Sequence, residues 1–351
     1  MECVTYRKQV ADNAIFATVP VASCPACPLT GLERFDNISH QPRLRVRWGM
    51  SVRTCSSFSR AFLCTLWLAC VLSGAVIPAE VKECVTFIFS PGQQGSPVPN
   101  GTGFFVGVSD PANKDRLFGY LVTAGHVLRD QNGKFYSDVF VRLNKKDGGS
   151  EMWRVPLSGS DAVPVVTHPD DSVDIAVLPL LPSPDRFQVK VIPESMITTK
   201  ELFQKQKIQE GDEVFFTGMF IQFLGAARNY PIMRFGRVAM VTDEKIPFQG
   251  KMMDLYLLET QSYGGNSGAP VFFNLDPSRD ASGSIVVAPR ILLLAGIMMG
   301  SFLDAQELRI AQRNPVPVSV ANAGIAAVVP AHYLEDILQS PRLVALRKAT
   351  K

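Results

Sequence analysis

The 351-residue sequence predicts an all-β protein, and three observations favour this fold class. Short runs rich in Val, Phe and Thr recur from Cys84 onward. Clusters of Gly, Pro, Asn and Asp separate these runs, as they commonly do between β-strands. Long helical periodicity is absent between Ser267 and His332.

The individual elements follow from these runs. The first six expected strands are 84–89, 103–108, 117–123, 139–143, 152–155 and 175–180. Prolines at 179, 182 and 184 then mark a linker, and 200–208 is expected to be a short helix or a surface loop. A turn leading into a strand is expected over 211–218, and the later expected strands are 234–241, 255–260, 270–273, 291–299 and 324–330. A short helix is expected over 331–338.

Composition limits the possible functions. A hydrophobic content of 46% is enough for one large core or two moderate ones. Residues 1–60 hold eight Lys/Arg against four Asp/Glu, and the remainder is near neutral. The main body has no basic block that would favour nucleic-acid binding. All seven cysteines lie within the first 84 residues, so no disulfide framework is expected beyond Cys84. Cys24 and Cys27 have metal-pair spacing, but no second pair or suitably placed histidine completes a zinc site.

The amino-terminal region has the plan of a secretory signal. Met50 is followed by Arg53 and Arg60, then by an apolar run over 61–72 and by small residues. We therefore hypothesise that translation starts at Met50, that 1–49 is a mis-called or disordered extension, and that 50–79 is a signal peptide cleaved after Ala75 or Ala79. The protein is then expected to be secreted or periplasmic. The alternative is an uncleaved anchor, the one arrangement in which we expect contact with a membrane.

The stretch 264–270, Gly-Gly-Asn-Ser-Gly-Ala-Pro, is the strongest candidate for a functional site. It joins a polar run to the apolar run 271–273, which predicts a tight loop entering a strand. The glycines leave the Ser267 hydroxyl uncrowded and let successive N–H groups point into one space, as an oxyanion hole requires. Taken alone, the stretch also fits an ordinary turn between two strands.

Two other motifs supply a base and an acid. His126 follows the apolar run 120–123, and Asp174 opens the apolar run 175–178. The spacing is 48 residues from His126 to Asp174 and 93 from Asp174 to Ser267. His168 competes as the base but lies in a loop with no strand leading into it. Asp170 and Asp171 compete as the acid, but Asp174 alone directly opens the strand.

These motifs, together with Gly-Thr-Gly-Phe-Phe-Val at 101–106, resemble the trypsin-like serine peptidases over roughly residues 83–340. The order His, Asp, Ser is theirs, and the HtrA-like bacterial branch is the most similar. The resemblance implies two six-stranded antiparallel β-barrels, over 83–181 and 190–330, with a terminal helix over 331–339. Many HtrA-like enzymes also carry a PDZ domain, which is not expected here because too few residues follow that helix. It also implies a serine endopeptidase that acts on polypeptides and needs no cofactor.

Residue roles are carried over from the family position by position. The resemblance makes His126, Asp174 and Ser267 the catalytic triad, and the N–H groups of Gly265 and Ser267 the oxyanion hole. The substrate pocket would be formed by Gln261, six residues before the serine, and by Met298, Met299 and Ser301 on its wall. In trypsin a new amino terminus pairs with an aspartate just before the nucleophile; here that position is the neutral Asn266.

Two other functions stay open. A trypsin-fold protein can bind peptides without turnover, although such binders typically lose triad residues. In an esterase of the α/β-hydrolase class, 265–269 would form the nucleophile elbow, whose sequence pattern it loosely matches. That fold needs the order Ser, acid, His, and only His332 lies downstream of Ser267.

Overall fold

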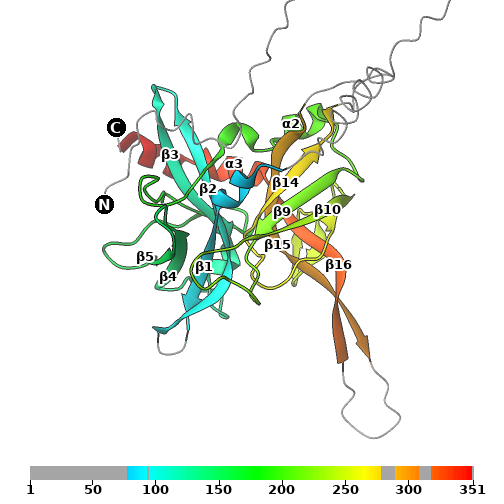
Figure 1. Ribbon diagram of the computed structural model, residues 1–351. Coiled ribbons are helices and arrows are strands. Elements are labelled where there is room, and N and C mark those ends of the chain that lie inside the picture. The colour runs from blue at the N-terminus through cyan, green and yellow to red at the C-terminus, as the bar shows by residue number, and fades with distance from the viewer. Residues whose placement is uncertain (1–76, 93–94, 278–288, 308–317, 350–351) are drawn as a thin grey trace, which may run out of the picture. The chain divides into compact units, whose positions relative to one another are not determined.

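The computed structural model describes residues 77–92, 95–277, 289–307 and 318–349 (Figure 1). The predicted start at Met50, the Cys24–Cys27 pair and all but the last three residues of the expected signal segment lie outside the described residues. Among the described residues, no helix is long and apolar enough to cross a membrane.

The first half of the described chain forms one eight-stranded sheet. Its strands are β1 (Val85–Pro91), β2 (Pro97–Asp110), β3 (Asn113–Ala124), β4 (Asp138–Asn144), β5 (Ser150–Pro156), β6 (Val166–Thr167), β7 (Ile175–Leu178) and β8 (Ile192–Pro193). They follow the order β5-β4-β1-β2-β3-β7-β6, and β8 pairs with β2 in parallel. All six expected strands are found here. The extra strands β6 and β8 have two residues each, too short for an alternating pattern to reveal them.

The second half forms a closed six-stranded barrel, as expected (Figure 1). In ring order its strands are β10 (Ile232–Met240), β13 (Tyr256–Glu259), β16 (Val318–Pro330), β15 (Ile291–Glu307), β14 (Pro270–Leu275) and β9 (Glu213–Gly218). A separate hairpin, β11 (Ile246–Phe248) with β12 (Lys251–Met253), was not predicted. The pairing of β15 with β16 continues to Glu307 opposite Val318.

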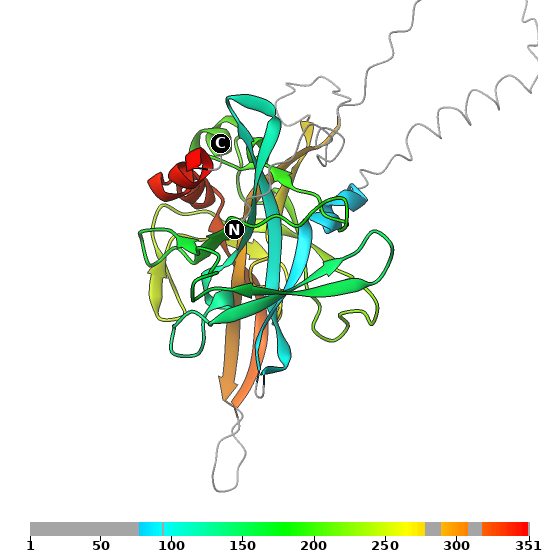
Figure 2. The ribbon, with the colours of Figure 1, turned by 90° about the vertical axis from the view of Figure 1, so that its left-hand side faces the viewer.

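Among the residues that the structure describes, helices are few and short. The α-helices are α2 (Lys200–Lys205), α3 (His332–Leu338) and α4 (Pro341–Ala349), and the 3-10 helices are η2 (Ala79–Cys84), η4 (Gly125–Leu128) and η5 (Glu194–Met196). The Thr199 hydroxyl accepts from Leu202 N–H and caps the start of α2. α3 packs against β7. α4 follows α3 in the chain, and the two are the red helices of Figure 2. α4 was not predicted.

Side-chain alternation explains how the first sheet acquires its core. In β4, Val139, Val141 and Leu143 are buried, whereas Phe140 and Arg142 between them are only partly covered. Successive strand residues point to opposite faces, so one face of β4 faces the core. Phe87, Phe104 and Phe105 are also fully buried in this core. Each such side chain contributes on the order of 2 kcal/mol to folding through removal of apolar surface from water.

We predict that His332 makes the fold acid-sensitive. Its side chain is buried, and its Nε2 has no hydrogen-bond partner among the described residues. Burial, and then the charge of Lys200, lower the pKa of His332 in the folded state. The unfolded chain therefore binds more protons as the pH falls below about 6.5, so the free energy of unfolding decreases toward acid.

Urea unfolding at pH 7.5 and pH 5.5 measures this effect. The loss of stability between the two pH values should be smaller in His332→Phe than in the original protein. An unchanged loss in the variant would contradict the assignment to His332.

Candidate functional site

Ser267 lies in a loop between β13 and β14 that its glycines shape. Gly265 and Gly268 both have positive φ, at 87° and 83°, which glycine adopts without steric cost. A Cβ atom at Gly268 would collide with the Thr102 carbonyl oxygen and the Thr123 hydroxyl. Glycine at 268 therefore lets the nucleophile loop lie directly against β2 and β3.

His126 and Asp174 meet because their strands pair. β3 ends at Ala124, which lies opposite Ile175 at the start of β7. His126 is in η4, directly after β3, and Asp174 directly precedes β7. Gly125 permits the approach, since a Cβ there would come within 2.8 Å of Asp174 Oδ1.

The Asp174 carboxylate binds His126 with both oxygens. Oδ1 accepts from the backbone N–H of His126 at 2.9 Å, and Oδ2 lies 2.5 Å from its Nδ1. The imidazole is 42% exposed and the carboxylate 17%. A carboxylate at Nδ1 favours the tautomer with its proton on Nδ1, which leaves Nε2 free to accept a proton.

The Ser267 side chain is hydrogen-bonded to Met299, a residue that lines a cavity with His126 and Asp174. Its hydroxyl donates to the Met299 carbonyl at 3.0 Å. Met299, His126 and Asp174 all line one cavity of about 660 Å³. In this structure the hydroxyl is thus paired with a backbone carbonyl, and rotation about its Cα–Cβ bond would redirect it. The hydrogen bond between a nucleophile and its base is often long or poorly aligned in an apo structure and tightens only when substrate is bound.

The N–H groups of Gly265 and Ser267 have no acceptor within the part of the chain that the structure describes. Two free N–H groups next to a serine hydroxyl are what a developing oxyanion requires. Asn266, between them, is 1% exposed. Its Nδ2 donates to Met219 O at 2.7 Å, and its Oδ1 accepts from Tyr263 N–H at 2.9 Å. The neutral amide therefore holds the loop through backbone groups.

Thr102 is a residue of this site that the sequence analysis did not single out. It is fully buried in β2. Its N–H donates to Ser267 O at 2.8 Å, and its hydroxyl donates to Gly265 O at 2.6 Å. The available signal was the Gly-Thr-Gly at 101–103, whose glycines flank the threonine.

The expected substrate-pocket residues differ in their surroundings. Met298 is fully buried among the apolar side chains of the second barrel, whereas Met299 lines the cavity with His126. The register of β15 against β16 shifts between Met298 and Gly300, so simple alternation of side chains does not hold here. That both methionines line the substrate pocket stays a prediction. Ser301 is half-buried on β15. Gln261 is exposed, and its Oε1 accepts from the Tyr263 hydroxyl at 2.7 Å.

The competing histidine and acids have other partners. His168 lines the same cavity, but its Nδ1 accepts from Asp170 N–H and its Nε2 lies 3.9 Å from Asp336. Hydrogen bonds from Ser172 lower the pKa of the Asp170 carboxyl to about 2. Asp171 is exposed, and its backbone carbonyl accepts from Lys251. Asp174 is the acid that the structure brings to His126.

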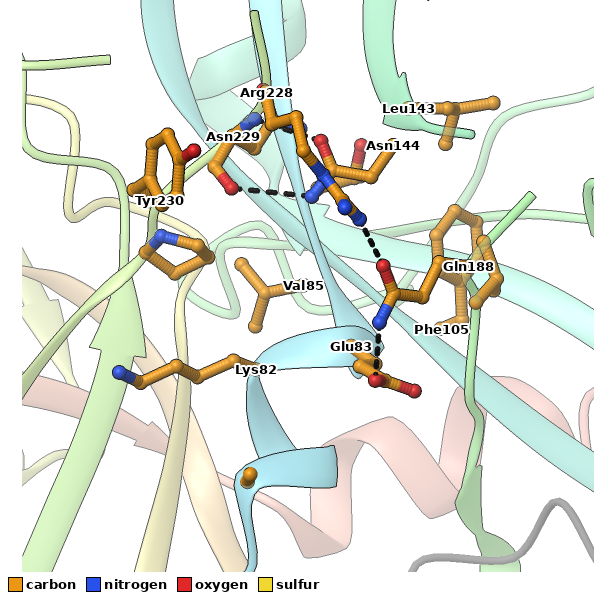
Figure 3. Close-up of a pocket in the computed structure, with 14 residues that line it drawn as sticks. Lys82, Glu83, Val85, Phe105, Leu143, Asn144, Gln188, Arg228, Asn229 and Tyr230 are labelled. Carbon is orange, nitrogen blue, oxygen red and sulfur yellow. Dashed lines mark hydrogen bonds between the residues drawn. The ribbon is translucent and has the colours of Figure 1, made fainter. Parts of the chain in front are cut away.

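A second cavity, of about 360 Å³, lies between the first sheet and the loop 219–231 (Figure 3). Across it, Arg228 donates to Gln188, and Gln188 donates to Glu83 at 2.6 Å. Asn144 and Asn229 are joined by two hydrogen bonds, at 3.1 and 2.7 Å. These contacts fix the loop that begins at Met219, the residue that binds Asn266.

Comparison with known proteins gives a family match. A model described as the trypsin-like peptidase domain matches residues 101–276, just over half of the chain. The MamO protease domain of Magnetospirillum magneticum covers 74% of this chain and 98% of its own, at 17% identity and a TM-score of 0.41. The thermostable serine protease AL20 from an extremophilic microorganism covers 74% and 99%, at 15% identity and a TM-score of 0.40. No curated protein matches the sequence.

Proposed function

Since this chain belongs to the trypsin-like peptidase family, we propose that it is a serine endopeptidase with Ser267 as nucleophile, His126 as base and Asp174 as the acid that orients it. The observation that carries the proposal is the His126–Asp174 pair, with Nδ1 and Oδ2 2.5 Å apart. The pair lines a cavity together with Met299, whose backbone carbonyl accepts from the Ser267 hydroxyl. Peptidase family membership implies polypeptide substrates.

The chemistry assigns each group one task. A serine hydroxyl is a weak nucleophile at neutral pH, so His126 Nε2 takes its proton as Oγ attacks the peptide carbonyl. The N–H groups of Gly265 and Ser267 then bind the oxygen that becomes negative. His126 returns the proton to the leaving amine, while Asp174 stabilises the imidazolium.

Labelling with a fluorophosphonate, followed by peptide mapping, tests this proposal. We expect covalent labelling of Ser267, and hydrolysis of a peptide substrate that the label abolishes. An unlabelled Ser267 would instead support the catalytically silent peptide-binding protein. Hydrolysis of esters but not of peptides by the labelled serine would support an esterase.

We predict a preference for medium-sized apolar side chains before the cleaved bond. Gln261, six residues before the serine, has no charge, and Met299 and Ser301 carry none either. A basic side chain would therefore lose water without gaining an ion pair. A peptide-library cleavage profile measures this preference. A profile dominated by Lys or Arg would contradict it.

We also predict activity without a preceding proteolytic cut. Because Asn266 is held by Met219 and Tyr263, the loop needs no ion pair with a new amino terminus. Fluorophosphonate labelling of the chain, with intact mass measured on the same sample, should show labelled protein uncut between residues 80 and 100. Labelling that appears only after a cut in that range would contradict this prediction.

A further inference from the structure

The Thr102 hydroxyl joins the nucleophile loop to the loop that starts at Met219. Its Oγ1 accepts from Met219 N–H at 2.9 Å and donates to Gly265 O at 2.6 Å. A hydroxyl has one proton, so with Met219 N–H directed at the oxygen, that proton goes to Gly265. Thr102 is fully buried, so bulk solvent has no access to its hydroxyl.

These bonds are part of a closed ring. Met219 O accepts from Asn266 Nδ2 at 2.7 Å, and Asn266 follows Gly265 in the chain. Thr102, Gly265, Asn266 and Met219 therefore constrain one another. The backbone N–H of Thr102 also donates to Ser267 O at 2.8 Å, so the ring is attached to the nucleophile itself.

Gly265 has the greatest backbone freedom of the residues in this ring, because it has no side chain. Glycine adopts positive and negative φ about equally well, and here φ is 87°. Rotation of the Gly265 backbone would turn its N–H relative to that of Ser267. The Gly265 carbonyl is held by the Thr102 hydroxyl, and the Ile221 side chain packs over the Gly265 Cα.

We propose that Thr102 is a positioning residue whose hydroxyl selects the Gly265 conformation that aims its N–H at the oxyanion. The inference rests on the proposed function, because it assigns Thr102 a part in the same reaction. Thr102 itself does not touch substrate. It acts through Gly265, so its loss should slow the covalent step and leave the initial binding of a ligand nearly unchanged.

A purely structural role is the competing explanation, and Thr123 provides a matched control. Thr123 is also a fully buried threonine, and its hydroxyl donates to Thr102 O at 2.7 Å. It belongs to the same cluster but has no hydrogen bond to the 265–266 segment. Loss of the Thr102 hydroxyl removes two buried hydrogen bonds and loss of the Thr123 hydroxyl removes one, so Thr102→Ala should be the less stable variant, at about 1–3 kcal/mol for each partner left unsatisfied.

The experiment uses the full chain and a fluorophosphonate probe, with the maximal rate of Ser267 labelling and the probe concentration at half-maximal rate measured separately. Loss of an oxyanion donor costs about 100- to 1000-fold in rate. We expect Thr102→Ala to lower the maximal rate by at least about tenfold, because it displaces such a donor, with the half-maximal concentration changed less than about twofold. Thr102→Ser should restore the rate to within about threefold, and Thr123→Ala should label nearly as fast as the original.

Thermal unfolding of each variant separates stability from rate. If Thr102→Ala does not fold, Thr102→Val repeats the test with the side-chain volume kept. Equal rates for Thr102→Ala and the original protein would overturn the inference, and so would an equal loss in Thr123→Ala. Unlabelled Ser267 in the original protein would refute the proposed function, and this inference with it.

Discussion

Replacement of Ser267 or His126 by alanine is expected to abolish peptide hydrolysis, with a loss of roughly 10⁶-fold in kcat, as when the members of a triad act as one unit. Ser267→Ala removes the attacking oxygen, and His126→Ala removes the group that accepts its proton. The fold should persist, because Ser267 is half-buried and His126 is exposed. The measurements are kcat on a peptide substrate and the thermal unfolding midpoint of each variant.

His168 supplies the control for the base. It lines the same cavity as His126, but its ring nitrogens face Asp170 N–H and Asp336. His168→Ala should therefore keep kcat within about tenfold of the original, since it removes no proton acceptor from Ser267. Near-normal turnover in His126→Ala combined with its loss in His168→Ala would reverse the assignment.

The second large effect is expected from Asp174→Asn, with a loss of about 10⁴-fold in kcat. An asparagine can keep the acceptor that binds His126 N–H, but its amide donates toward Nδ1. The imidazole then carries its proton on Nε2 and cannot accept one from Ser267. Turnover of a peptide substrate at neutral pH measures this effect.

Asp171→Asn is the matched control for the acid. Asp171 lies three residues before Asp174, is exposed, and uses its backbone carbonyl to bind Lys251, which the substitution leaves in place. We expect its turnover to remain within about threefold of the original, because His126 loses no contact. Equal losses in the two variants would show that the negative charge of the loop matters more than the contact with His126.

Much of the fold could be predicted because local pattern determines it. The alternation of Val139, Val141 and Leu143 with partly exposed neighbours identifies β4 without knowledge of its partners. Strands of two residues, such as β6 and β8, have no such pattern and exist only through their pairing with longer strands. The hairpin of β11 and β12 was missed for a related reason, since each strand has only three residues.

Some features of the candidate site could likewise be predicted from the sequence, whereas others depend on the tertiary structure. The all-β fold class and the order His, Asp, Ser could be predicted from the residues alone, because strand periodicity, glycine conformation and side-chain chemistry are properties of residues and their neighbours. The sequence could not determine that Met298 faces the barrel core and Met299 the cavity, which depends on how β15 lies in the barrel. Nor could it reveal the bond from Thr102 to Gly265, which joins residues 163 positions apart. Only tertiary structure decides such contacts, because they form when two distant segments are packed together and water is excluded between them.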